Sequence, residues 1–200
     1  NVVVNAAAAV GAGTSVESLN ITGTFSQSGK MIVELAGGGA SGAGAGTQYD
    51  LIAVTGNGTL TSGSTIDVDL VGFNPGSGKY FDVLTALDIN GAGNSLAGVT
   101  FDYSSAALAA GLTWQESIVA AGASEALRLS VRFLGDADGN NEVNFDDLGI
   151  LLNNYIQPGT FDTGDFNKSG TVDFTDLGIL LNNYNQSAPL AAVADPVPEP

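Results

Sequence analysis

The pattern of apolar and polar positions predicts short β-strands over residues 14–134. In the clearest stretch, residues 64–70, Ile66, Val68 and Leu70 alternate with two aspartates. Alternate side chains of a strand point to opposite faces, so the three apolar residues face a core. Other segments of strand composition, separated by turns rich in small and polar residues, lie at 16–35, 49–54, 79–87, 99–103, 112–114 and 126–133. Eight or nine such strands predict a mainly β fold, a jelly-roll-like β-sandwich.

Residues 1–13 combine an apolar segment with a glycine hinge. Residues 1–10 are apolar without alternation, which favours a strand buried on both faces, and Gly11-Ala-Gly13 follows them. Two interpretations stay open. The segment is the ordinary first strand of its own domain, or it is donated to a neighbouring subunit and joins copies of the chain into a homo-polymer. The residues that would make such a contact are Val2, Val3, Val4 and Val10.

An internal repeat occupies residues 136–184. A stretch of twelve residues rich in Asp and Asn, 136–147, precedes Leu-Gly-Ile-Leu-Leu-Asn-Asn-Tyr at 148–155, and the arrangement returns 29 residues later at 165–176 and 177–184. The apolar positions of the two identical segments have helical spacing. The repeat therefore predicts two loops, each followed by one short helix.

The spacing of oxygen-bearing side chains in each loop suits calcium. Calcium takes about six to eight oxygen ligands, and a twelve-residue loop supplies them from positions 1, 3, 5, 7, 9 and 12. The sequence thus predicts two calcium ions, bound by two sets of residues. The first set is Asp136, Asp138, Asn140, Glu142, Asn144 and Asp147, and the second is Asp165, Asn167, Ser169, Thr171, Asp173 and Asp176. The alternative interpretation is a pair of turns whose Asp and Asn residues only cap two helices.

Two further positions of each loop carry a structural expectation. Position 6, Asn141 or Gly170, must adopt a positive φ for the sharp turn, which glycine does without steric cost. Position 8 is valine in both loops, Val143 and Val172. A β-branched residue there predicts a short strand that pairs one loop with the other.

Residues 135–186 resemble the type I dockerin family, with two calcium loops that end in Asp and short helices that start Asp-Leu. The resemblance implies a small α module that folds around calcium and, in the family, docks onto a cohesin domain. Dockerins select cohesins with positions 10 and 11 of each loop, which here are Phe145-Asp146 and Phe174-Thr175. Two aromatic residues there favour packing against a neighbouring domain.

Other features indicate an exported bacterial protein. The terminal Val197-Pro-Glu-Pro200 resembles the PEP-CTERM sorting signal, and residues 49–87 resemble autotransporter-associated β-repeat proteins, which implies an exported β scaffold. The first residue, Asn1, suggests a processed mature chain. Asn-X-Ser/Thr triplets, as at Asn20, permit glycosylation. We therefore expect an extracellular location, at the bacterial cell surface or in a matrix, where calcium is abundant.

Composition excludes several functions. The chain has 21 acidic and 5 basic residues, a net charge of −16, and nine of the acids lie between Asp136 and Asp176. This balance argues against nucleic acid or an anionic membrane as a partner, and no segment is long and apolar enough to span a membrane. The absence of His and Cys removes the usual triads and zinc sites. Asp67 and Asp69 share a strand face as a glycosidase pair would, but their alternation places them in water, so we expect no enzyme.

These observations predict four segments: an apolar strand and hinge (1–13), a β-sandwich (14–134), a dockerin-like calcium module (135–186) and a Pro-rich tail (187–200). The predicted function is a non-enzymatic, calcium-stabilised structural protein that assembles into a fibre or lattice through its first strand. The alternative is a tethering or carbohydrate-binding module, attached to a cohesin-bearing scaffold or a polysaccharide. The single Trp114 is the residue suited to a sugar platform.

Overall fold

The computed structural model describes residues 1–38 and 44–188, which form two compact units. The boundary separates Asn1–Arg132 from Phe133–Pro200, two residues before the predicted one. Residues 39–43 and most of the Pro-rich tail (189–200, including the sorting-signal motif) lie outside the described residues.

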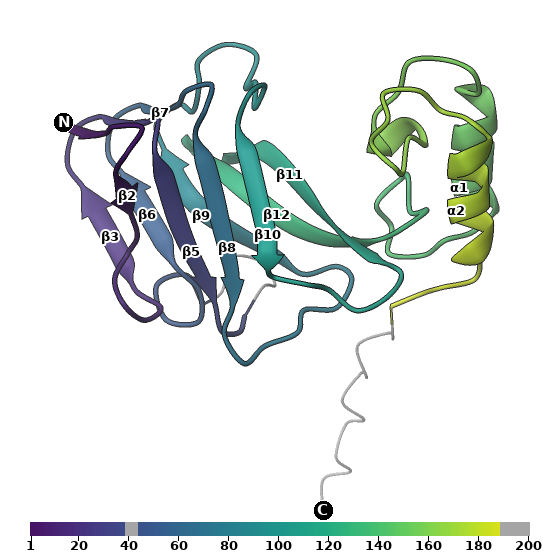
Figure 1. Cartoon of the computed structure of the whole chain (residues 1–200), viewed down its shortest axis with the longest axis horizontal. Helices are drawn as coiled ribbons and strands as arrows, with labels where there is room; N and C mark the ends of the chain where they lie inside the picture. The colour runs from purple at the N-terminus through teal and green to yellow at the C-terminus, as the bar shows by residue number, and fades with distance from the viewer. Residues whose placement is uncertain (39–43, 189–200) are drawn as a thin grey trace, which may run out of the picture. The chain divides into compact units, whose positions relative to one another are not determined.

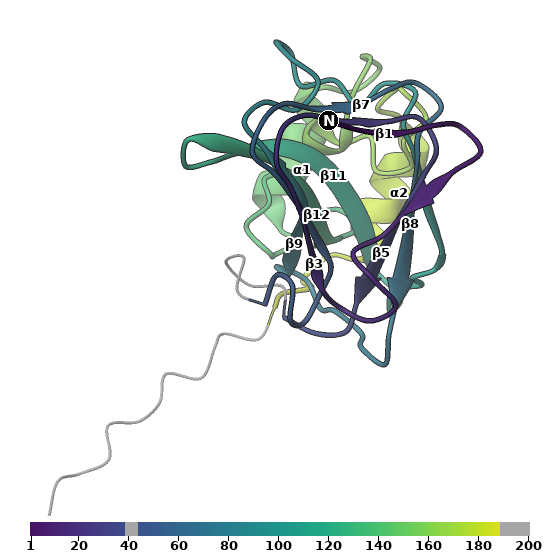
Figure 2. The ribbon, with the colours of Figure 1, turned by 90° about the vertical axis from the view of Figure 1, so that its left-hand side faces the viewer.

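The first unit is a chain wound in coils, and each coil contributes one strand to each of three sheets (Figure 2). The first coil, residues 1–23, holds β1 (Val2–Val4), β2 (Ala9–Val10) and β3 (Ser18–Ile21). The second holds β4 (Phe25–Gln27), β5 (Lys30–Leu35) and β6 (Leu51–Val54), and the third holds β7 (Gly58–Leu60), β8 (Thr65–Leu70) and β9 (Tyr80–Ala86). The unit ends with β10 (Thr100–Ser105), β11 (Leu112–Ala121) and β12 (Ser124–Phe133).

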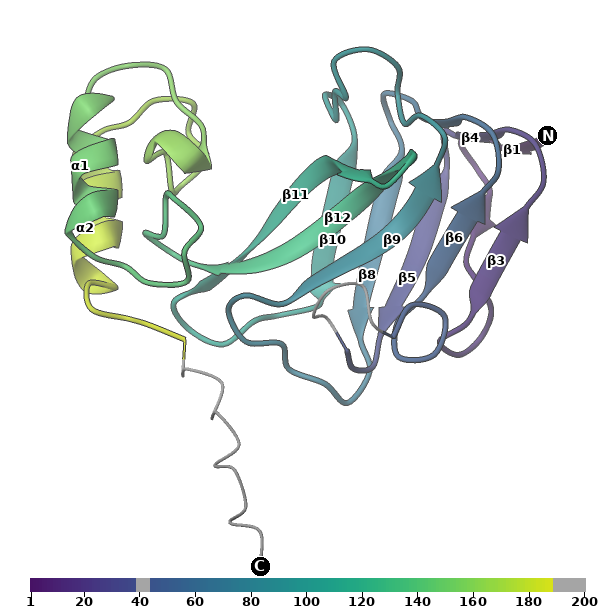
Figure 3. The ribbon, with the colours of Figure 1, turned by 180° about the vertical axis from the view of Figure 1, so that it is seen from behind.

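The three sheets have the orders β1-β4-β7 (sheet A), β10-β8-β5-β2 (sheet B) and β11-β12-β9-β6-β3 (sheet C). Sheet B is seen in Figure 1 and sheet C in Figure 3. Strands of successive coils pair in parallel, and β12 joins β9 antiparallel. The unit is therefore a three-sided β-solenoid, closed at one end by the hairpin of β11 and β12.

The predicted fold class, a jelly-roll-like β-sandwich followed by a small α dockerin-like module, is wrong. The chain is instead a mixed fold, with three sheets that contain parallel pairs and two short helices. Side chains alternate with period two in parallel and antiparallel strands alike, so the alternation from which we inferred strands contains no information on the pairing partner. Two adjacent parallel strands need a long connection between them. Here the rest of one coil provides this connection.

The core lies inside the coils, where residues of equal register stack. Met31, Ile66 and Phe101 form one such row across sheet B, and Val33 pairs with Val68 in another. All but the partly buried Phe101 are fully enclosed. The corners need small residues because coils touch there: a Cβ on Gly29 would collide with the carbonyl oxygen of Ala8. Glycine is thus required where one coil passes over the next.

The apolar amino-terminal segment belongs to the solenoid. Val2 is in register with Phe25 of β4, and Ala9 with Lys30 of β5. Within a single chain the segment is therefore an ordinary first strand, which is one of the two interpretations that the sequence left open. The alternation of apolar and polar residues is not visible in this segment because residues 5–8 form a corner between β1 and β2.

Asp50 ties the first two coils together from a buried position. Its carboxylate accepts hydrogen bonds from Glu17 N (2.9 Å) and Glu34 N (3.0 Å). Burial, the largest influence, raises the pKa of Asp50 above its ordinary value, although the two hydrogen bonds oppose the shift.

This pKa gives a test of the solenoid's pH dependence. Because the folded-state pKa of Asp50 is raised, protonation favours folding, and its stabilising contribution falls as the pH rises through the folded-state pKa. We expect the free energy of unfolding of the wild type, minus that of Asp50→Asn, to increase as the pH is lowered from 7 toward 3.8. Denaturant titrations at several pH values measure the difference, in which unchanged carboxylates cancel. A difference that shrinks at low pH would contradict the assignment.

The second unit contains α1 (Phe145–Asn153), a 3-10 turn η1 (Phe161–Thr163) and α2 (Phe174–Asn182). The two α-helices have nine residues each and begin at equivalent capping boxes, with Asn144 and Asp173 as N-caps. Its core contains seven buried residues, namely Ala137, Val143, Leu151, Phe161, Phe166, Val172 and Leu180. Among the described residues, neither unit has a helix with the length and apolarity needed to cross a membrane.

Candidate metal centre

The first loop, 136–147, is folded around two buried carboxylates. Asp136 accepts hydrogen bonds from Gly139 N (2.7 Å) and Asn141 N (3.3 Å), which curls the loop back on its first residue. Asp147 accepts from Ala137 N (2.7 Å) and Asn144 N (2.9 Å), so the last residue of the loop holds both ends. Both aspartates are 0% exposed. The loop is therefore preorganised by the residues predicted as ligands 1 and 12.

Asp138 completes a cluster that can hold a metal ion. One carboxylate oxygen from each of Asp136, Asp138 and Asp147 lies within 4.8 Å of the others. Asp138 is exposed and keeps its carboxylate near the loop through Asn140, whose N (3.0 Å) and Nδ2 (3.0 Å) donate to it. An ion among the three would contact two buried carboxylates and one solvent-exposed carboxylate. Such a set of oxygen ligands suits a hard cation.

The other predicted ligands of the first loop lie farther along its rim. Asn140 Oδ1 accepts from Glu142 N (2.8 Å), and Asn144 Oδ1 caps α1 by accepting from Asp146 N (2.7 Å). Glu142 is exposed, and its side chain accepts from Asn144 Nδ2 (3.4 Å). Asn141, at position 6, has φ 67°, as predicted.

The second loop, 165–176, repeats this construction. Asp165 accepts from Ser169 N (2.9 Å) and Gly170 N (2.7 Å), and Asp176 accepts from Asn167 N (3.1 Å) and Asp173 N (2.9 Å). Asp165 is 2% exposed and Asp176 0%.

The polar rim of the second loop differs in detail. Asn167 Oδ1 accepts from Ser169 N (2.9 Å), and Ser169 Oγ donates to Thr171 O (3.1 Å). Asp173 caps α2 by accepting from Thr175 N (2.7 Å), as Asn144 does for α1. Position 3 of this loop is the neutral Asn167, so the loop lacks the carboxylate that Asp138 supplies at the same position of the first.

Electrostatics favour a cation in this unit. Residues 133–188 contain nine acidic side chains and one basic one, Lys168. Each loop buries two carboxylates, and buried charges of one sign are costly unless a cation compensates them. Loops of this geometry can bind a metal ion, which would compensate the charges of the buried carboxylates.

Each loop is braced by the segment that follows the helix of the other repeat. The sequence did not lead us to predict this contact. Val143 N donates to Gln186 O (2.8 Å) after α2, and Val172 N donates to Gln157 O (3.0 Å) after α1. The prediction that Val143 and Val172 pair the two loops directly is therefore wrong. The missed signal is that the repeat continues as Tyr-X-Gln after each helix, at 155–157 and 184–186. The residue before each Gln, Ile156 or Asn185, has a positive φ (64° and 65°).

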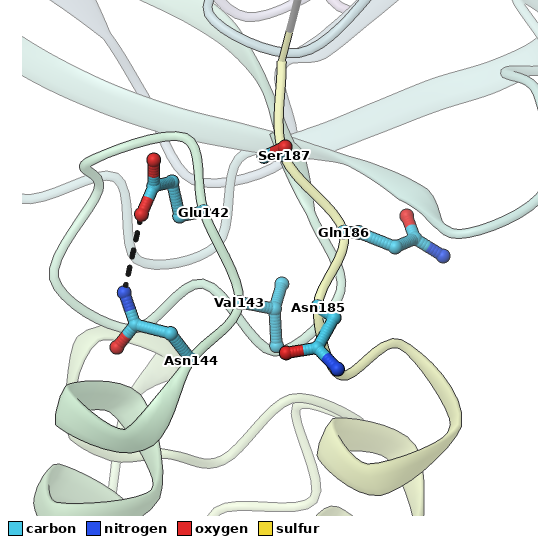
Figure 4. A pocket seen from close by; sticks show the side chains of 6 residues that line it. All are labelled: Glu142, Val143, Asn144, Asn185, Gln186 and Ser187. Carbon is cyan, nitrogen blue, oxygen red and sulfur yellow. Dashed lines mark hydrogen bonds between the residues drawn. The ribbon is translucent and has the colours of Figure 1, made fainter.

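The brace at the first loop forms a shallow pocket (Figure 4). Residues 142–144 and 185–187 line it, and Glu142 pairs with Ser187 as an isolated bridge. The side chains of Glu142 and Asn144 point toward one another on one side of their segment, and Val143 points to the other side (Figure 4). The pocket thus marks where the chain after α2 meets the first loop.

The repeat also exposes equivalent apolar side chains. Phe145 is 72% exposed and its copy Phe174 is 75% exposed, and Leu152 and Leu181, about two helical turns later, are also exposed. Of the predicted apolar helix faces, Leu151 and Leu180 are fully buried and the residues Leu148, Ile150, Tyr155, Leu177 and Ile179 pack partly against the core.

The candidates in the first unit have structural roles. Trp114 is 5% exposed, stacks on Tyr103 with ring centroids 5.2 Å apart, and donates from Nε1 to Ala106 O (2.9 Å), so it offers no open sugar platform. Asp67 forms an ion pair with Lys30 (2.7 Å) on sheet B.

Comparison with known proteins yields no family for this chain: no protein-family model matches it, and no curated protein does. The assignment of function therefore rests on the geometry of the site.

Proposed function

We propose that residues 136–176 bind two calcium ions and that this binding folds the second unit of an extracellular structural protein. The supporting observation is the duplicated loop that buries a carboxylate at positions 1 and 12, with Asp136, Asp138 and Asp147 converging within 4.8 Å in the first copy. The complete ligand sets are those given by positions 1, 3, 5, 7, 9 and 12 of each loop.

Calcium is favoured over other metals by the donor set. Every candidate ligand is an oxygen, and the chain contains no His or Cys to select a transition metal. Magnesium needs near-ideal octahedral geometry and gives up water reluctantly, whereas calcium accepts the irregular and partly solvated arrangement of exposed Asp138 and Asn140.

The proposed role is structural. The first unit is a solenoid whose interior is filled by side chains, and its aromatic residues Tyr49, Phe81 and Trp114 pack on one another in the core. Location outside the cell, at a surface or in a matrix, would keep both loops filled, because extracellular calcium modules work at dissociation constants of about 10⁻⁴–10⁻³ M. This proposal includes no catalytic step.

Tethering is the second candidate function, and the exposed Phe145 and Phe174 favour it. In the dockerin resemblance these positions face a cohesin, so the proposed partner is a cohesin-bearing scaffold. We expect the double variant Phe145→Ala/Phe174→Ala to abolish capture by immobilised cohesins without changing calcium affinity. Absence of capture by a panel of cohesins for the unaltered chain would reject tethering and leave the structural role.

Calcium binding is tested by titration calorimetry on chain stripped with chelator. We expect two ions per chain in the wild type and one in Asp147→Ala, with at least about a 100-fold loss at the first loop, because even residues that only orient a ligand cost 10–100-fold. Asp146→Ala is the matched control: it removes the adjacent, exposed carboxylate and should still bind two ions. Equal effects of the two substitutions would show that only net charge matters, and absence of binding in the wild type would reject the proposal.

A further inference from the structure

The first coil leaves one edge of every sheet uncovered within the described part of the chain. β1, β2 and β3 are each the last strand of their sheet. Val2 N donates to Thr24 O (2.9 Å) and Val4 O accepts from Ser28 N (2.8 Å). Since backbone groups alternate in direction along a strand, the N–H and C=O of Val3 point away from β4. The coil thus presents hydrogen-bonding groups on three sides.

The apolar interior is open at the same end. Val2 is 38% exposed, whereas Phe25, in register with it in the second coil, is 1% exposed. Val10 is likewise only partly buried, and its partner Met31 is fully buried. The rows that end in Val2 and Val10 therefore lack a last neighbour, whereas Val4 and Ile21, each 5% exposed, are already buried.

Residues 1–23 themselves carry few of the devices that protect solenoids and edge strands. Natural solenoids close with a polar cap, and open edges carry charges, prolines or bulges. Residues 1–23 contain no proline, and their one charged side chain is Glu17, in a chain with 26 charged residues (21 acidic and 5 basic). A surface with so little charge allows two copies of a chain of net charge −16 to approach.

The opposite end is closed. Sheet A is covered there by residues 88–90, because Gly58 N donates to Asp88 O (2.8 Å) and Asn90 N to Gly58 O (3.0 Å). Sheet B ends in β10, which carries an irregular register, and sheet C ends in the β11–β12 hairpin. Because the three sheets contain three, four and five strands, their far edges end at different levels. Head-to-tail stacking would therefore meet a mismatched surface.

We propose that two copies of this chain bind each other, first coil to first coil, about a two-fold axis. The three open edges belong to one coil, and the partner that offers three edges at the same spacing is another such end. The two-fold axis reverses strand direction, so β1 pairs antiparallel with its own copy and the interface closes as a dimer. Val2, Val3 and Val10 lie at this contact. The proposal goes beyond calcium binding and is independent of it.

The test is sedimentation velocity of the whole chain, with any tag at its carboxyl end, in calcium and again in chelator. We expect a two-chain species in both conditions. Val3→Lys and Val3→Pro should convert it to single chains that remain folded, because Val3 is 64% exposed and makes none of the β1–β4 hydrogen bonds given above. Val71→Lys is the matched control, with the same charge change at a valine 49% exposed elsewhere in the unit, and should remain a dimer.

Four outcomes would overturn the proposal. A wild type that stays a single chain up to about 100 μM would exclude a stable interface. Loss of the dimer in Val71→Lys as well as in Val3→Lys would place the contact elsewhere. Growth into an open series of larger species would show head-to-tail assembly in place of a closed pair. Dissociation only in chelator would move the interface to the calcium unit.

Discussion

Removal of calcium is expected to unfold residues 133–188 while residues 1–132 stay folded. The second unit has a core of seven buried residues and two helices of nine residues, which is too little to hold four buried carboxylates of like charge. At a calcium concentration about 100-fold above its dissociation constant, each site adds about 2.7 kcal/mol of stability, or about 5 kcal/mol for two. That is comparable with the whole stability of a small domain.

The chain offers separate signals for the two units. Both described α-helices belong to the second unit, and the single Trp114 is buried in the first. We expect chelation to remove most of the helical circular dichroism and to leave Trp114 fluorescence unchanged. Calcium should restore the helical signal, and magnesium at the same concentration should restore less of it. A helical signal that survives chelation would contradict the proposal that calcium folds this unit.

Phe81→Ala is expected to be the most damaging single substitution in the solenoid. Phe81 is fully buried in β9, with its ring 5.3 Å from Tyr49, 6.2 Å from Phe73 and 6.1 Å from Trp114, measured between centroids. Removing a buried phenyl ring leaves a cavity and costs about 3–5 kcal/mol. Here three aromatic neighbours would also lose their common partner.

Denaturant unfolding followed by Trp114 fluorescence measures this loss. Phe145→Ala is the matched control, because it makes the same chemical change at a side chain exposed in the second unit and should alter the solenoid by less than about 0.5 kcal/mol. A loss below about 1 kcal/mol in Phe81→Ala would show that the interior can collapse around the cavity, contrary to the packing in the structure.

Local features of the chain were predictable from the sequence. Ile66 and Val68 face the core as their alternation indicates, and Asn141 and Gly170 adopt the positive φ required at position 6. Each depends on neighbours within a few residues: the period of a strand, or the sterics of one turn. The positions of Asp136 and Asp147 at the two ends of the first loop likewise follow from loop spacing.

Other features depend on residues far apart in the chain. β7 was missed because it has three residues, includes Gly58 and follows an Asn, which is the composition of a turn. Its pairing with β4, in which Gly58 is in register with Phe25, makes it a strand. In the same way, Val143 and Val172 were expected to pair with each other, but their backbone N–H groups donate to the segments that follow the helices.

Local periodicity and spacing were thus enough to predict the inward faces of the strands, the duplicated loops and their candidate calcium ligands. Contacts between residues far apart in the chain were needed to show that the strands wind into a parallel solenoid, that the first segment forms its first coil, and that each loop is braced by the segment after the helix of the other repeat. Many different segments could cover the apolar faces of a strand or pair with its hydrogen-bonding edges. Which segment does so depends on how the backbone hydrogen bonds of the whole chain are satisfied.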